Sequence, residues 1–211
     1  MNFPIIHDDI MTSTWYNMAQ SLIPYIPWYR KNFSCEKKDY TANSIEEYGK
    51  NDYGHFGHTL YQIDESNNNV IQSDYWEKFA PLVYTISSLH ERECHTIIRA
   101  KLNYTWPIKD AQHMMPHSDI DNNPIRPKYI DSNKNYYSCV YYLSESDGDL
   151  ILFDDVKVYA NYIIDLKNIA ESERISPKSN RGVFFDSRSF HAGSYSTNKD
   201  RICCNIVWEG S

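Results

Sequence analysis

The sequence predicts an α+β fold that is mainly β, a sandwich or barrel of short strands with helices packed on one outer face. The first half of the chain holds two segments with helical spacing of apolar residues, and the second half holds short β-rich runs between turn residues. The 211 residues are enough chain for one domain with a substantial core. We therefore expect a single domain over 1–211, helical and irregular at 1–94 and β-rich at 95–211.

Two amphipathic helices are expected in the first half. The run TSTWYNMAQSLI at 12–23 opens with Thr and Ser, spaces its apolar residues helically and is followed by two prolines that end it. The run SDYWEKFAPLVYTISSLHERE at 73–93 opens with Ser73 as a cap. Its apolar side chains follow one face: Trp76, Phe79, Leu82, Val83 and Ile86. The polar stretch at 35–69 is expected to loop over the surface.

Six strands are expected in the second half, at 95–106, 135–144, 148–154, 157–164, 181–186 and 201–209. In the first of them apolar and polar residues alternate, so Arg99, Lys101 and Asn103 share one face. In an ordinary strand this polar face points to solvent. In a barrel with a wet interior it points inward, toward an anionic ligand.

Composition narrows the partners and the compartment. The net charge of −7 disfavours tight, sequence-independent binding of nucleic acid, which needs cations to neutralise phosphates. No run approaches the roughly eighteen apolar residues of a membrane span, and the first residues lack a basic start. We expect a cytoplasmic protein. Five cysteines without a CxxC pair indicate neither a disulfide framework nor a zinc ribbon.

The segment MPHSDI at 115–120 places two metal-competent groups one residue apart. If it is extended, His117 and Asp119 share a face, although a surface turn has the same composition. His191 lies between two expected strands and offers a third ligand. Two histidines and one carboxylate that leave coordination positions open are the arrangement of non-heme Fe(II) oxygenases.

Arg201 opens the last expected strand. A buried arginine needs an anion to meet its fork of donors, and a dicarboxylate co-substrate would do so bidentately. An internal ion pair is the alternative.

With these residues the chain resembles the Fe(II)/2-oxoglutarate-dependent oxygenases of the prolyl-hydroxylase-like type. The resemblance rests on HSD at 117–119, YYSCVYYLSESDGDLILFDD at 136–155 and PKSNRGVFFDSRSFHAGSYSTNKDRICCNIVW at 177–208. It covers about half of the chain, roughly from Thr96 to Trp208, with the motifs in the family's order. It implies that the β-rich part is a double-stranded β-helix, or jelly roll.

The resemblance also implies the site and its reaction. His117, Asp119 and His191 would bind Fe(II) and form the catalytic centre, with 2-oxoglutarate and O2 as co-substrates. The expected activity is a 2-oxoglutarate-dependent dioxygenase that hydroxylates an unactivated C–H bond and releases succinate and CO2. Because related halogenases lack the carboxylate, Asp119 favours hydroxylation.

Three further residues would bind 2-oxoglutarate by the same resemblance. Arg201 would hold the distal carboxylate, and Tyr142 would place its hydroxyl on the same group. Asn103, on the strand before the HxD motif, would meet the 1-carboxylate, with Tyr104 as the competing choice.

Two departures from the family pattern bear on the substrate. The usual paired glycine reads Asp147-Gly148-Asp149, and the stretch at 155–175 resembles an insertion for a lid or a substrate contact. Collagen-type prolyl hydroxylases generally use Lys where this chain has Arg201, so proline is not singled out. A peptidyl or free amino-acid side chain is the first expectation, and a nucleobase the second.

Other interpretations remain open at this level. The pair His113 and His117, the run HFGH at 55–58 and the run HERECH at 90–95 also cluster ligand types, although satisfied or exposed histidines explain them. A non-catalytic β-sandwich module that binds carbohydrate or peptide would fit the aromatic content. A cupin-like iron enzyme would use Arg201 in an ion pair.

Overall fold

The computed structural model describes residues 4–35, 37–63, 70–89, 94–110, 112–120, 131, 133–154, 156–158 and 163–211. Within them the larger sheet has eight strands in the order β1-β11-β6-β13-β5-β3-β2, with β4 paired to β3. These strands are β1 Ile5–His7, β2 Tyr29–Lys31, β3 His55–Ile63, β4 Val70–Gln72, β5 Cys94–Thr105, β6 Asn135–Tyr142, β11 Gly182–Asp186 and β13 Arg201–Gly210. All of the pairings within this sheet are antiparallel.

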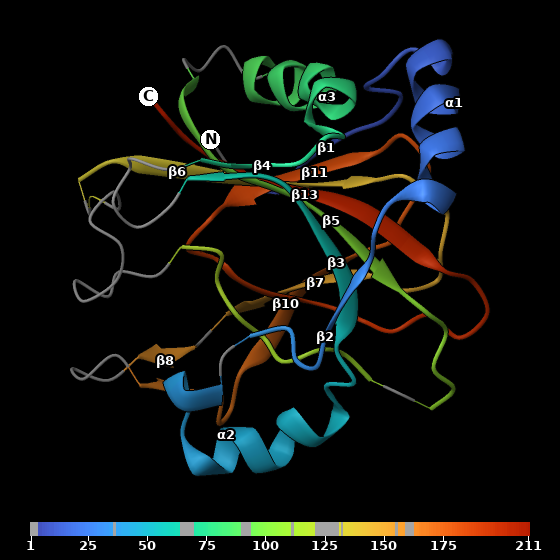
Figure 1. Ribbon diagram of the computed structural model, residues 1–211. Helices are drawn as coiled ribbons and strands as arrows, with labels where there is room; N and C mark the ends of the chain where they lie inside the picture. The colour runs from blue at the N-terminus through green and yellow to red at the C-terminus, as the bar shows by residue number, and fades with distance from the viewer. Residues whose placement is uncertain are drawn as a thin grey trace.

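A smaller sheet faces the larger one across the core (Figure 1). It runs in the order β10-β7-β12, with β7 at Leu150–Asp154, β10 at Ala170–Ile175 and β12 at Phe190–Gly193. Apolar side chains from both sheets meet in one cluster that includes Val140, Leu152 and Val183. The two facing sheets form the double-stranded β-helix, so the predicted mainly β fold is confirmed.

Two helices cover the outer face of the larger sheet (Figure 1). They are α1 at Ser13–Leu22 and α3 at Trp76–Ser88. The predicted apolar face of α3 is buried, with Phe79 and Leu82 at 0% exposure. These two helices confirm the expected packing on one outer face. No helix among the described residues has the length and apolar character needed to cross a bilayer.

The prediction of a surface loop at 35–69 was wrong. This stretch contains β3, whose pairing with β5 places it inside the larger sheet. It also contains α2 at Ala42–Glu47, which lies on the far side of the molecule from α1 and α3 (Figure 1). The strand escaped detection because its inward face carries a histidine, His55, and a glycine, Gly57, where a core strand normally has apolar side chains.

The prediction of one strand at 157–164 was also wrong. Within its described residues, β8 at Lys157–Val158 and β9 at Ile164–Asp165 are two strands that pair antiparallel with each other, so the two ends of the stretch do not belong to one strand. The following strand, β10, was missed because its residues AESERI are mostly exposed and charged, as edge strands often are. Strands β1, β2, β4 and β12 were missed as well, because each has only three or four residues.

Candidate metal centre and co-substrate pocket

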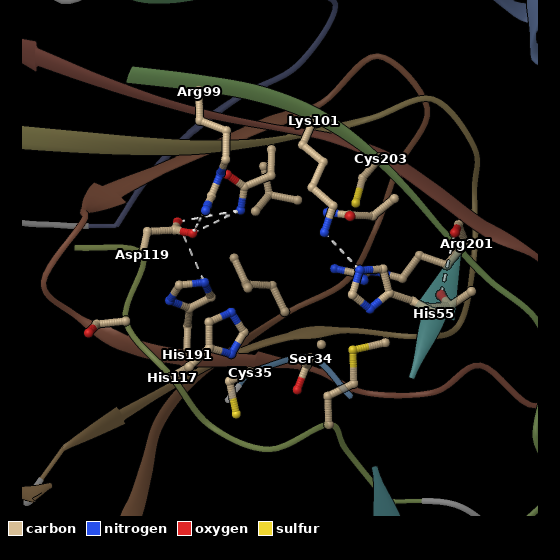
Figure 2. A pocket seen from close by; sticks show the side chains of 18 of the residues that line it. Ser34, Cys35, His55, Arg99, Lys101, His117, Asp119, His191, Arg201 and Cys203 are labelled. Carbon is tan, nitrogen blue, oxygen red and sulfur yellow. Dashed lines mark hydrogen bonds and ion pairs between the residues drawn. The ribbon is translucent and has the colours of Figure 1, made fainter. Parts of the chain in front are cut away.

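His117, Asp119 and His191 come together at one end of the space between the two sheets (Figure 2). One ligand atom from each lies within 4.8 Å of the others. His117 and His191 exchange backbone hydrogen bonds of 2.9 and 2.8 Å, so a bridge between the HxD segment and β12 fixes their separation. Residues 74 positions apart in the sequence thus meet because the HxD segment pairs with β12.

Both histidines present the same nitrogen to the shared centre. His117 Nδ1 lies 3.1 Å from the Met115 carbonyl, and His191 Nδ1 lies 3.0 Å from the Ser189 carbonyl. A carbonyl only accepts, so the proton sits on Nδ1 in each ring and Nε2 keeps its lone pair. This is how metal-binding histidines are usually oriented.

Asp119 is held by three side chains from the larger sheet. Arg99 donates to Oδ1, Ser138 donates to Oδ2 at 2.7 Å, and the Asn205 amide lies 3.4 Å from Oδ2. Burial by itself would raise the pKa of the Asp119 carboxyl, but Arg99, the two histidines and the Ser138 hydroxyl lower that pKa well below its usual range. The group is therefore a carboxylate at neutral pH, which is the form that binds a metal.

Burial has the opposite effect on the pKa of the His117 imidazole. It combines with the neighbouring His191 to lower the pKa of His117 to about 4. A neutral His117 at physiological pH has its Nε2 lone pair available. Two imidazoles and one carboxylate form a donor set that suits Fe(II).

Arg201 lies at the other end of the same pocket. Its side chain is buried, it makes no ion pair with any residue that the structure describes, and its Nε has no hydrogen-bond partner there. Gly193 on β12 leaves the space for the guanidinium, because an added Cβ would lie 2.7 Å from Arg201 Nη1. An ion pair of Arg201 within the described protein is thus ruled out as its role.

Tyr142 lies beneath Arg201, with the guanidinium carbon 5.5 Å from the centre of its ring. It is fully buried and is not among the described residues that line the pocket, and its hydroxyl lacks a partner in this part of the chain. Burial raises the pKa of Tyr142 to about 12, so it is a neutral hydrogen-bond donor.

Asn103 lines the pocket between these two ends, and Tyr104 does not. Alternation along β5 turns Tyr104 to the opposite face, where it packs against Trp28 and Phe56. The structure therefore places Asn103, and not the competing Tyr104, at the pocket.

The pocket has a volume of about 290 Å³ and a polar lining. Several buried polar atoms at or beside it have no hydrogen-bond partner among the described residues: His55 Nδ1, Arg99 Nε, Asn103 Oδ1, Tyr142 Oη, Arg201 Nε and Asn205 Oδ1. Because an unpaired buried polar group costs about 1–3 kcal/mol, such a cluster indicates a site built for a polar ligand.

The other histidine clusters do not assemble a ligand set. His113 stacks on Tyr48 and bonds the Met114 carbonyl, and His58 bonds the Pro27 carbonyl on the outer side of β3. Most of the run at 90–95 lies outside the described residues. Among the residues that are described, the cluster of three candidate ligands is the one around His117.

Three residues that contact Asp119 were not assigned a role from the sequence. The alternation that places Arg99 on the inward face of its strand was a usable signal for that residue. Ser138 and Asn205 carried none, because their contact with Asp119 depends on pairing of β6 with β13. The contact between Lys101 and His55 was also unforeseen, since the strand that carries His55 was not expected.

The fold and this site together define a class of protein, the non-heme iron oxygenases built on a double-stranded β-helix. A model of the 2OG-Fe(II) oxygenase superfamily matches residues 101–208, about half of the chain. The chain belongs to this superfamily. It is a 2-oxoglutarate-dependent dioxygenase that uses Fe(II), 2-oxoglutarate and O2.

Solved structures with the same fold support this placement. An oxidoreductase of the 2OG-Fe(II) oxygenase family from Burkholderia pseudomallei has a TM-score of 0.60 at 8% identity, over 98% of this chain and 85% of that one. A viral collagen prolyl hydroxylase from Paramecium Bursaria Chlorella virus-1, in complex with 2OG, has a TM-score of 0.51 at 13% identity, over 100% and 97%. A prolyl hydroxylase from Trichoplax adhaerens, in complex with a hypoxia inducible factor peptide fragment, has a TM-score of 0.54 at 12% identity, over 100% and 84%. None of the curated protein sequences matches significantly.

Proposed function

We propose that this enzyme hydroxylates an unactivated C–H bond of an amino-acid side chain, free or within a peptide. His117, Asp119 and His191 hold the Fe(II) in this proposal. The observation that carries it is the convergence of three candidate ligand atoms within 4.8 Å at one end of a pocket whose other end presents a buried guanidinium that makes no ion pair with the described residues. Similar structures that are named prolyl hydroxylases support the choice of substrate.

Bound Fe(II) supplies the oxidising chemistry, in which one atom of O2 enters succinate, the other enters the substrate, and CO2 is released. The protein supplies orientation and charge. Arg99, Ser138 and Asn205 hold the Asp119 carboxylate in one rotamer, and the carbonyls of Met115 and Ser189 hold the two rings. A fixed ligand set needs little reorganisation when the metal arrives.

Arg201 holds the distal carboxylate of 2-oxoglutarate in this proposal. A guanidinium that is buried, charged and without an ion-pair partner among the described residues forms a strong bidentate pair with a carboxylate. The Tyr142 hydroxyl beside it can donate to the same group. Asn103 meets the 1-carboxylate from β5, and apolar Met114, Val140 and Leu150 exclude water from the pocket walls.

Two variants separate metal binding from co-substrate binding. His191→Ala removes one imidazole and should abolish tight binding of Mn(II), the redox-silent stand-in for Fe(II). Arg201→Met should keep Mn(II) binding but weaken 2-oxoglutarate by roughly 100-fold, because the carboxylate loses a buried charged partner. Calorimetric titration of metal-free protein, first with Mn(II) and then with 2-oxoglutarate, measures both.

Arg174→Met is the matched control, since Arg174 is an exposed arginine on β10 that pairs with Glu171. It should bind both ligands like the wild type. Unchanged 2-oxoglutarate affinity in Arg201→Met would contradict the assigned role of Arg201. Product mass from peptide and amino-acid substrates, with one added oxygen atom per succinate formed, tests the hydroxylation itself.

A further inference from the structure

Lys101 is an inward-facing cation in the pocket besides Arg99 and Arg201. It lies on β5 between Arg99 and Asn103, and its ammonium donates to His55 Nε2 at 2.9 Å (Figure 2). Its cross-strand neighbour is Asn205, which contacts Asp119. The backbone of Lys101 therefore lies close to the candidate metal ligands. Its side chain then extends over β3 toward His55.

His55 completes a pair of donors. Because its Nε2 accepts from Lys101, the ring proton lies on Nδ1, and this buried N–H has no hydrogen-bond partner among the described residues. Burial and the neighbouring Lys101 lower the pKa of His55 to about 3, so the ring is neutral. Burial, Arg99 and Lys31 lower the pKa of Lys101 to about 8, so the ammonium is still mainly charged at pH 7.

The space for Lys101 comes from Gly57 on the neighbouring strand. A Cβ at this position would lie 2.7 Å from Lys101 Cε and 3.3 Å from its Nζ. Gly57 thus leaves space for the Lys101 side chain, just as Gly193 leaves space for the Arg201 guanidinium. Two cations of this pocket, Lys101 and Arg201, are each accommodated by a glycine on another strand.

Among the charged residues of the described pocket lining, Lys101 has no carboxylate as an ion-pair partner. The described lining contains the cations Arg99, Lys101 and Arg201 and the carboxylates Asp39 and Asp119. Fe(II) and the dianion 2-oxoglutarate cancel each other, so loading the site leaves one positive charge in excess. Arg99 is bound to Asp119, and Arg201 is assigned to 2-oxoglutarate.

We propose that Lys101, supported by His55, binds a carboxylate of the primary substrate. The inference rests on the proposed function, which assigns one carboxylate of 2-oxoglutarate to the metal and the other to Arg201. The primary substrate is then a carboxylic acid whose reactive C–H bond lies close to its carboxylate. A free amino acid and the C-terminal residue of a peptide share this chemistry, whereas an internal peptide residue other than aspartate or glutamate lacks it.

The test compares carboxylates with their amides on Mn(II)-loaded and 2-oxoglutarate-loaded protein without turnover. The probes are the free L-amino acids, their C-terminal amides, and dipeptides with a free or an amidated C-terminus, titrated calorimetrically. At least one acid should bind about tenfold or more tightly than its amide, because a charge-assisted hydrogen bond is lost in the amide. Preference for free amino acids or for dipeptides distinguishes the two sources of the carboxylate.

Lys101→Met should weaken that acid about tenfold or more and change 2-oxoglutarate affinity less than twofold. Lys101→Arg should restore part of the affinity. Lys78→Met is the matched control, since it removes an exposed lysine of α3 that does not line the pocket, and it should behave as wild type.

Three results would overturn the inference: amides that bind as tightly as acids, the failure of every acid to bind, or a tenfold loss of 2-oxoglutarate affinity in Lys101→Met. The last result would make Lys101 a co-substrate residue. Failure of the proposed function is distinguishable from these, because wild-type protein would then bind no 2-oxoglutarate in the presence of Mn(II).

Discussion

Asp119 shows how single residues set the properties of this site. A buried carboxylate needs compensation, and Arg99, Ser138 and Asn205 provide it with donors from three different strands. The same donors compete with a metal for the oxygen lone pairs. The balance keeps the group ionised and in place while Nε2 of His191, 3.7 Å from Oδ2, stays close enough to share an ion.

The charge of the partly buried Lys101 side chain should lower the stability of the folded protein. The folded pKa is about 8 and the ordinary value is 10.5, so between these pH values the unfolded chain binds more protons than the folded one. At pH 7 the free energy of unfolding of Lys101→Met should therefore exceed that of the wild type by up to about 3 kcal/mol. This difference should vanish as the pH rises from 8 to 10.5. Urea titrations of both metal-free proteins at several pH values measure it.

Lys78→Met is the control for that comparison, because Lys78 is exposed on α3, away from the pocket. It should show little difference from wild type at any pH. A Lys101→Met protein whose stability advantage stays constant from pH 7 to 10 would mean that packing, and not the buried charge, is responsible.

At the scale of elements, the short strand β12 serves both ends of the pocket. It carries His191 toward the candidate ligands and, two residues later, Gly193 against the guanidinium of Arg201. Its pairing with β7 on one side and its bridge to His117 on the other fix both positions. The proposed metal ligation and co-substrate binding thus both depend on one four-residue strand.

Gly193→Ala should separate these two roles. The added Cβ would lie 2.7 Å from Arg201 Nη1, so the guanidinium must move while His191 keeps its place. We expect 2-oxoglutarate affinity to fall about tenfold or more and Mn(II) affinity to change little, both by calorimetry. Gly49→Ala, where the nearest atoms lie at 3.4 Å, is the control. Equal loss of both affinities would indicate a general distortion of β12.

At the scale of the whole molecule, the candidate metal centre joins the two sheets. Asp119 is anchored to the larger sheet through Ser138 and Asn205, whereas His191 belongs to the smaller one. A metal ion bound between them would cross-link the sheets in the folded state only. That the whole chain forms a single domain stays a prediction.

Mn(II) should therefore raise the melting temperature. A ligand at 100 times its Kd stabilises the folded state by about 2.7 kcal/mol, which corresponds to roughly 5–10 °C for a domain of this size. Thermal melts with increasing Mn(II) measure the shift. His191→Ala should melt at a temperature that Mn(II) leaves unchanged, and a persistent shift in this variant would place the metal elsewhere.

The sequence by itself determined the mainly β class, the two helices over the larger sheet, and the candidate ligands, because HxD spacing, strand alternation and an amphipathic helix are local patterns. The inward direction of Arg99, Lys101 and Asn103 was left as one of two possibilities, since alternation gives a face but not what covers it. Only the tertiary structure decided that this face lines a pocket. It also decided the partners of Asp119, the contact of His55 with Lys101 and the role of Gly193, because each depends on which distant strands pair, and no local pattern encodes that register.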